Sequence, residues 1–219
     1  MNTSPHSRWI SAAEFAVGAA IVVGHNVFRF LPNEVPILFV LALVSFRVRE
    51  GNWRAMGVAR PEAWKRVLLI AVGAAALRLV LGQFVVEPLA ARVWPPMVAP
   101  SGSESIAGNW RVTLEWLALV WTFAAVGEEV GYRGYLLTRA AQALGGARAA
   151  WWAAVVLSAV LFGYGHSYKG PAGIADSAVA GLVLGTVYLM ARRNLWACVI
   201  AHGLIDTVGV AAAFLGINS

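Results

Sequence analysis

The stretch VTLEWLALVWTFAAVGEEVGYRGYLL, residues 112–137, decides the fold class and carries the most informative polar residues of this chain. Its first part, Val112 to Gly127, is almost wholly apolar and is interrupted by Glu115. Two adjacent carboxylates, Glu128 and Glu129, follow directly. Ionisable groups at membrane depth are energetically costly and are usually kept for a function. The stretch therefore indicates a membrane helix that contains a polar site.

The composition agrees with a membrane protein, because 59% of the residues are hydrophobic and only 13% are charged. Soluble domains have about 25% charged residues. Apolar runs, each compared with the roughly 20 residues that one membrane crossing requires, lie at residues 10–28, 35–46, 67–86, 112–144, 149–165, 172–191 and 195–216. We predict an all-α, polytopic transmembrane helix bundle of about seven to eight spans, in which 35–46 is short. Residues 1–219 should form a single integral membrane domain, with the motif-bearing core at about 112–216.

The net charge of +6 does not indicate a nucleic-acid-binding protein, because the Lys and Arg residues lie between the apolar runs. Their distribution follows the positive-inside rule. It places the loops at 47–66, 133–148 and 192–193 in the cytoplasm, and the segment 87–111 on the other side. The first run lacks a clear signal-peptidase site, so we expect it to be retained. We predict an integral protein of a bacterial inner membrane.

The spacing of the polar residues within the runs predicts which of them share a helix face. On an α-helix with 3.6 residues per turn, Glu128 and Glu129 point about 100° apart and should have different roles. Glu129 and Arg133 are four residues apart and should form a structural ion pair, while Glu128 faces a cavity. His202 and Asp206 have the same spacing in the last run.

A predicted turn at Gly145 and Gly146 brings the first carboxylate near a histidine. At a rise of 1.5 Å per residue, Glu128 and His166 lie roughly 26 and 30 Å from this turn on antiparallel helices, so they could meet. His202 matches this depth less well. We take Glu128, His166, His202 and Asp206 as the candidate active site.

Three motifs now stand in order on successive apolar segments: Glu-Glu-x-x-x-Arg at 128–133, Phe-x-x-x-His at 162–166 and His-x-x-x-Asp at 202–206. Each motif alone is weak, but the three together resemble the CPBP (Abi) family of glutamic intramembrane endopeptidases, related to the type II CAAX prenyl proteases. The resemblance covers about residues 120–210. The first half of the chain contributes only hydrophobicity to it.

The resemblance implies peptide hydrolysis without a metal or another cofactor. Glu128, helped by His166, would take a proton from the attacking water, and His202 with residue 206 would stabilise the oxyanion. Many family members have Asn at the last position, where Asp206 stands here. An ionised Asp cannot donate a hydrogen bond, so Asp206 either orients His202 or is protonated. The implied substrate is a membrane protein or peptide, either lipidated or unmodified, with C-terminal sorting tails among the candidates.

Two other classes remain open from the residues themselves. Glu128, His166, His202 and Asp206 offer zinc-type ligands, which would suit a metalloprotease, although no His-Glu-x-x-His motif is present. Alternatively, the polar residues only stabilise helix packing in a non-hydrolytic immunity protein, scaffold or small transporter. Arg78, in the middle of an apolar run, either neutralises a buried carboxylate or extends to the membrane interface.

Overall fold

The computed structural model describes residues 4–94 and 103–217, and within these ranges all regular elements are helices. The predicted all-α class is confirmed. The first half comprises α1 (Pro5–Asn26), α2 (Glu34–Arg49), the 3-10 helix η1 (Trp53–Met56), α3 (Trp64–Leu81), the π-helix η2 (Gly82–Val86), α4 (Glu87–Val93) and α5 (Ser103–Ile106). The second half comprises α6 (Trp110–Leu119), the π-helices η3 (Val120–Glu128) and η4 (Val130–Leu137), α7 (Thr138–Ala143), α8 (Arg148–Tyr164), the 3-10 helix η5 (Ser167–Lys169), α9 (Gly170–Met190) and α10 (Leu195–Phe214).

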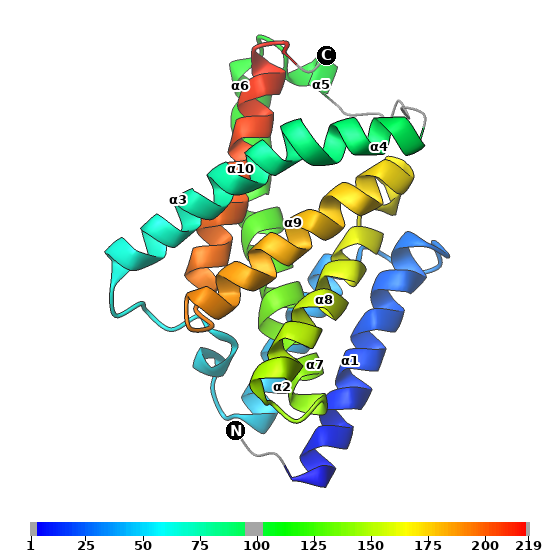
Figure 1. Ribbon diagram of the computed structural model, residues 1–219, viewed down its shortest axis with the longest axis vertical. Coiled ribbons are helices and arrows are strands. Elements are labelled where there is room, and N and C mark those ends of the chain that lie inside the picture. Colours follow the sequence, from blue (N-terminus) through cyan, green and yellow to red (C-terminus); the bar gives the residue numbers. More distant parts are fainter. Residues whose placement is uncertain (1–3, 95–102, 218–219) are drawn as a thin grey trace.

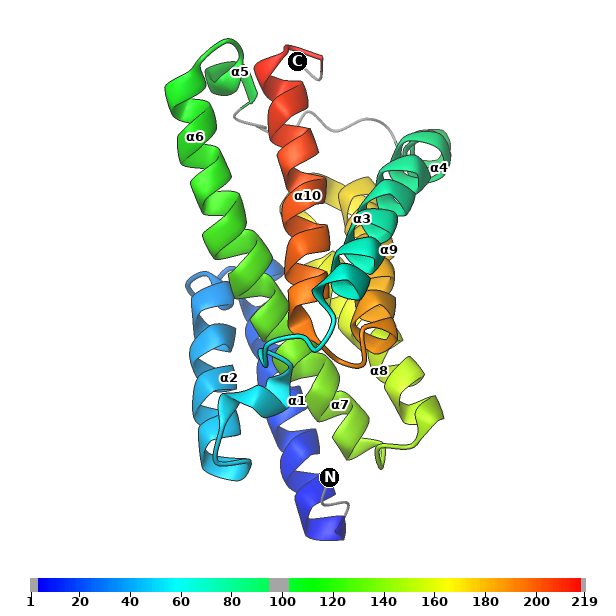
Figure 2. The same ribbon diagram turned by 90° about the vertical axis from the view of Figure 1, so that its left-hand side faces the viewer.

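One continuous helical rod, from α6 through η3 and η4 to α7, runs along most of the molecule (Figure 2). Helices α1, α2 and α8 surround its lower part, whereas α10 lies beside its upper part and packs against α3 on its other side (Figures 1 and 2). The end of α2 and the turn between α7 and α8 point to one end of the molecule, and α4 and α5 lie at the other. This arrangement separates the basic loops from the segment 87–111, of which residues 95–102 lie outside the described residues.

The predicted count of seven to eight membrane spans is not confirmed. Four helical segments in the described residues are long and apolar enough to cross a membrane: Pro5–Asn26, Trp64–Val93, Ser167–Met190 and Leu195–Phe214. Helices α2 and α8 have only 16 and 17 residues, fewer than the roughly 20 that a crossing needs. The remaining run, 112–144, is helical, but it is divided among α- and π-helical segments.

The helix that carries the two glutamates has a wider winding than predicted. Its residues from Val120 to Leu137 are almost entirely π-helical, with hydrogen bonds between residues five apart instead of four. The α-helical period assumed from the sequence is therefore wrong for this segment. Two glycines let the wide helix approach α2, because a Cβ atom at Gly127 would lie 2.9 Å from Val35 and one at Gly131 would lie 3.0 Å from Leu38. Extended π-helix is rare, and π-turns are frequent at functional sites.

A buried polar joint ties the N-terminal helices to the lower end of the rod. Arg139 of α7, which has no exposed surface, lies 3.0 Å from Glu14 of α1 and 2.7 Å from Glu50 after α2. Glu14 also pairs with Arg49 and accepts a hydrogen bond from Ser45. Two arginines and two glutamates thus balance one another, as buried charges require.

Arg78 lies in an ion pair with a carboxylate on another apolar helix. Its Nη2 is 2.5 Å from Oδ2 of Asp176 in α9, and the arginine is only 8% exposed. Of the two alternatives for Arg78, the structure therefore favours charge neutralisation over extension to the interface. Gly82, one turn further along, gives the guanidinium its room, because a Cβ atom there would lie 2.4 Å from Nη1.

Candidate active site

Glu129 is the centre of a fully buried charge cluster where η3 meets η4. Its Oε1 accepts a hydrogen bond from Nη1 of Arg133 at 2.8 Å, which is the pair that the spacing of four residues predicts. The same oxygen lies 2.7 Å from Nδ1 of His202 on α10. Glu129 and Arg133 are 0% and 1% exposed. One carboxylate oxygen therefore links two helices of the site.

His202 lies between two carboxylates. Its Nδ1 faces Glu129, while its Nε2 is 3.4 Å from Oδ2 of Asp206, one turn further along α10. An imidazolium, which has two N–H donors, satisfies both contacts. The contact to Asp206 is longer than a strong hydrogen bond, so the Nε2–H can also reach another acceptor. Asp206 therefore contacts the side of the ring opposite to Glu129.

The hydrogen bond of His166 determines which of its nitrogens is available. Nδ1 lies 2.9 Å from the carbonyl oxygen of Phe162, at the end of α8. A carbonyl only accepts, so Nδ1 must carry the proton. In the neutral ring, the lone pair is then on Nε2, where it can accept a hydrogen bond from water.

Glu128 is half-buried, and it differs from its neighbour in its contacts. Its Oε2 is a buried atom without a hydrogen-bond partner in the described part of the chain. Oε2 of Glu129 and Oδ1 of Asp176 are in the same state, but each of these two carboxylates forms an ion pair through its other oxygen. The charges of His202 and Asp206 act on Glu128, and they also act on His166. The four residues of the candidate site are thus gathered from η3, the end of α8, and α10. A buried carboxylate oxygen without a partner calls for an explanation, such as a bound water molecule or a catalytic role.

Phe162 holds these groups in place. Its ring lies 4.3 Å below the guanidinium of Arg133, 4.8 Å from the ring of His166 and 6.0 Å from the ring of His202. Tyr132 packs edge-on against it at 5.0 Å. The contacts of Phe162 are those of packing. Its position explains why an aromatic residue stands four residues before His166.

The described residues contain no group of three or more His, Cys, Asp or Glu side chains arranged to hold a metal ion. The sulfur of Cys198, one turn before His202, is buried and donates to the carbonyl oxygen of Leu184 at 3.4 Å.

One further acidic residue, close to the site, escaped the sequence analysis. Glu34 is 4% exposed and accepts a hydrogen bond from the hydroxyl of Tyr132 at 3.2 Å. Its other oxygen lies 3.5 Å from Nε2 of His25, a residue near the end of α1. In the sequence, Glu34 follows Asn33 at the start of an apolar run, which is typical of an exposed helix N-terminus. Only the packing of α2 against the rod buries it.

The comparison with known families bears directly on this cluster. Residues 110–208 match the model of the family described as Type II CAAX prenyl endopeptidase Rce1-like. The family resemblance is confirmed. The Rce1-like segment spans just under half of the chain and contains all six residues of the candidate site and its ion pair, whereas Glu34 and Arg78 lie outside it. No curated protein and no solved structure matches the chain.

The Rce1-like match, together with the four long apolar helices, indicates an integral membrane protein with a protease fold of the CAAX type. It implies a hydrolase, so the protease class predicted from the motifs is supported at this level.

The contact between η3 and α10 gives a first testable prediction. A Cβ atom at Gly203, next to His202, would lie 2.6 Å from the ring of Trp121, whose Nε1 donates to Thr207 at 3.2 Å. Gly203→Ala should therefore separate the helices and lower the free energy of unfolding by about 1–3 kcal/mol. Gly209→Ala is the matched control on α10, because nothing lies within 4 Å of that position. Thermal unfolding in detergent checks both, and equal stability of the two variants would contradict the tight contact.

Proposed function

We propose that the chain is a glutamic intramembrane endopeptidase, in which Glu128 and His166 activate a water molecule to hydrolyse a peptide bond. The observation that carries the proposal is the buried Oε2 of Glu128, which has no partner among the described residues. Glu128 lies in one charge cluster with His166. Nδ1 of His166 donates to the carbonyl oxygen of Phe162, so its Nε2 remains available to accept a hydrogen bond from water. A base and an orienting acceptor are what a nucleophilic water needs.

The proposed reaction balances with the residues of the site. The water oxygen attacks the carbonyl carbon as Glu128 accepts one proton and His166 Nε2 accepts a hydrogen bond from the other. The charge that develops on the carbonyl oxygen is stabilised by the Nε2–H of His202. When the C–N bond breaks, the proton on Glu128 passes to the leaving amine.

Asp206 is a positioning residue in this proposal. It faces Nε2 of His202 at 3.4 Å, and Glu129 faces Nδ1 at 2.7 Å. The two carboxylates fix the ring and stabilise its protonated form. A cationic donor stabilises an oxyanion more strongly than a neutral one. An Asp at this position is therefore compatible with hydrolysis through His202.

The proposed substrate is a membrane protein or peptide that presents its scissile bond within the bilayer, either lipid-modified or with an unmodified tail. We also propose that α2, α8 and the helical rod complete the crossings begun by the four long helices. The basic loops would then lie on the cytoplasmic side of a bacterial inner membrane. This orientation follows from the positive-inside rule.

Mapping of peptide termini in membranes tests the proposal. Cells that produce the wild-type protein and cells that produce Glu128→Gln at matched levels are compared by mass spectrometry. We expect termini that occur only with the wild type, and in isolated membranes we expect their formation to continue in the presence of a metal chelator. Identical maps would argue for the non-hydrolytic alternative, and loss of the termini with chelator would argue for the zinc protease.

A further inference from the structure

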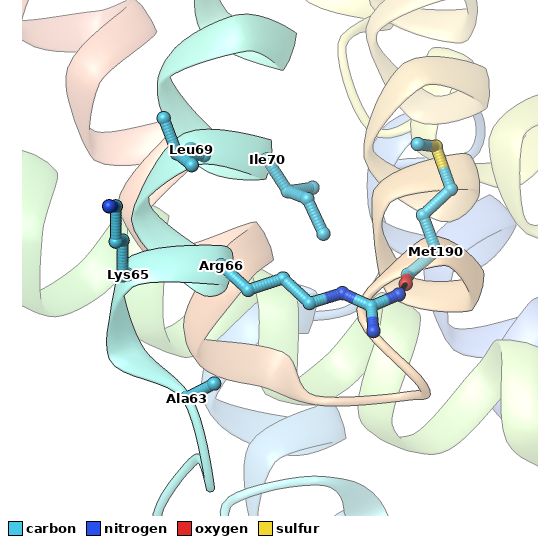
Figure 3. Close-up of a pocket in the computed structure, with 6 residues that line it drawn as sticks. All are labelled: Ala63, Lys65, Arg66, Leu69, Ile70 and Met190. Carbon is cyan, nitrogen blue, oxygen red and sulfur yellow. Dashed lines mark hydrogen bonds between the residues drawn. The ribbon is translucent and has the colours of Figure 1, made fainter.

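A group of basic side chains lies away from the candidate active site, around the C-terminal end of α9. Met190, the last residue of α9, lines two neighbouring pockets there. Figure 3 shows the first of them, in which Ile70 of α3 extends toward the helix that carries Met190. The side chain of Arg66 extends across this pocket and donates to the main-chain carbonyl of Met190 at 3.3 Å (Figure 3). The charge of Arg66 is therefore already used to cap the end of α9.

The second pocket differs, because its charged side chains surround an open space of about 660 Å³. We call it the arginine pocket; it is lined by Arg148, Trp151, Trp152, Leu189, Arg192 and Arg193, besides Met190 and Gly146. No acidic residue lines it. All three arginines are exposed. The pocket thus presents cationic side chains of three arginines, and its lining is complementary in charge to an anion.

The geometry of the arginine pocket is fixed by the fold. The guanidinium of Arg193 lies 4.8 Å from the ring centre of Trp151, and Nε1 of Trp151 donates to the carbonyl of Gly146 at 3.2 Å. Arg192 and Arg193 have φ angles of 56° and 62°. This left-handed conformation is unfavourable for residues other than glycine. Strained residues are concentrated at functional sites, and here two consecutive strained arginines line one pocket.

The chemistry of the walls indicates the class of ligand. Arginine binds phosphate through paired N–H donors. Tryptophan is enriched at the level of the lipid head groups, where its ring contacts apolar chains. Trp152, which is 43% exposed, and the apolar side chains of Leu189 and Met190 offer such a surface beside the three cations. Basic pockets between helices on the cytoplasmic side of membrane proteins bind anionic head groups.

We propose that the arginine pocket binds an anionic phospholipid, with its phosphate between the three arginines and its glycerol and upper acyl chains against Trp152, Leu189 and Met190. The proposal does not depend on peptidase activity. It assigns a ligand to a part of the chain that the candidate site does not use.

The test uses the full-length protein in mixed micelles of phosphatidylglycerol and phosphatidylcholine, with native mass spectrometry to count the retained lipids. We expect the wild type to retain phosphatidylglycerol selectively. Each single substitution, Arg148→Gln or Arg192→Gln, should weaken this binding about fivefold, which is the contribution of one arginine near the membrane surface. The two substitutions together should weaken it about 30-fold. The matched control, Arg54→Gln with Arg60→Gln, also removes two exposed arginines, from the loop at 47–66. It should bind as the wild type does.

Three results would overturn the proposal. An equal loss of binding in the control variant would mean attraction by overall charge without a site. Unchanged binding in both the double and the single pocket variants would mean that the lipid binds elsewhere. Displacement of phosphatidylglycerol by inorganic phosphate at comparable concentration would mean a site for a soluble anion, because a lipid site gains affinity from its apolar wall as well. If the double variant does not fold, the two single variants decide.

Discussion

Glu128→Gln is expected to lower the rate of peptide cleavage by about 10²–10⁴-fold, the range that general acid–base catalysis contributes, without a change in thermal stability. Gln has nearly the same shape as Glu but cannot accept the proton of the attacking water. The buried Oε2 of Glu128 has no partner among the described residues, so the substitution breaks no bond at this atom. The rate is measured on a peptide whose cleavage the map of termini identifies, and stability is followed as thermal unfolding in detergent.

Glu115→Gln provides the matched control for Glu128→Gln. Glu115 lies on α6, in the same helical rod, and its side chain is 64% exposed in a surface pair with Arg111. The Glu115→Gln variant should cleave the peptide at the wild-type rate. If Glu128→Gln retained more than about a tenth of the wild-type rate, a general-base role for Glu128 would be excluded by magnitude.

Glu129→Gln, one residue further on, should differ from Glu128→Gln in its effect on stability, because it should destabilise the whole fold. Arg133 is 1% exposed, and its positive charge is balanced by Glu129. Removal of one member of a buried ion pair costs about 3–5 kcal/mol. The same oxygen binds His202, so activity should also be lost. The free energy of unfolding and the yield of folded protein measure the effect.

A double variant separates the structural role of Glu129 from its effect on His202. In Glu129→Leu with Arg133→Met, both charges are replaced by apolar side chains, which is often neutral for stability. Stability should recover while activity stays low, because His202 has lost its acceptor. The exposed Arg111 and Glu115 pair has the same spacing, and Glu115→Gln should cost less than about 1 kcal/mol there. A similar cost at Glu129 would contradict its buried structural role.

The sequence allowed the helical class and the membership of the polar cluster to be predicted, because both depend on local patterns. Apolar runs fix the helices, and a spacing of four residues brings Glu129 to Arg133 and His202 to Asp206. The link between Glu129 and His202 was not predictable in this way. It joins residues 73 positions apart on two helices whose rotation depends on packing.

The winding of the rod and the buried state of Glu34 show where local patterns are insufficient. Nothing in the apolar run at 112–127 distinguishes a π-helix from an α-helix, because both bury the same residue types. The wide helix depends on contacts such as that of Gly131 with Leu38. Glu34 has the sequence pattern of an exposed N-terminal residue, and only tertiary contact with Tyr132 gives it a buried partner. Asp176 did carry a local signal, as an isolated acid within an apolar run.

The ion pairs also differ in the order in which the ribosome delivers their members. Glu129 and Arg133 are synthesised almost together, and Glu14 has Arg49 to neutralise it before Arg139 is made. Arg78 has no such early partner, because Asp176 follows it by 98 residues and is synthesised much later. In the candidate span Trp64–Val93, Arg78 lies near the middle and has no carboxylate partner until Asp176 is made. An arginine at the centre of a helix costs about 2.5–3.5 kcal/mol during insertion. We expect α3 to remain at the translocon until α9, which carries Asp176, has been synthesised.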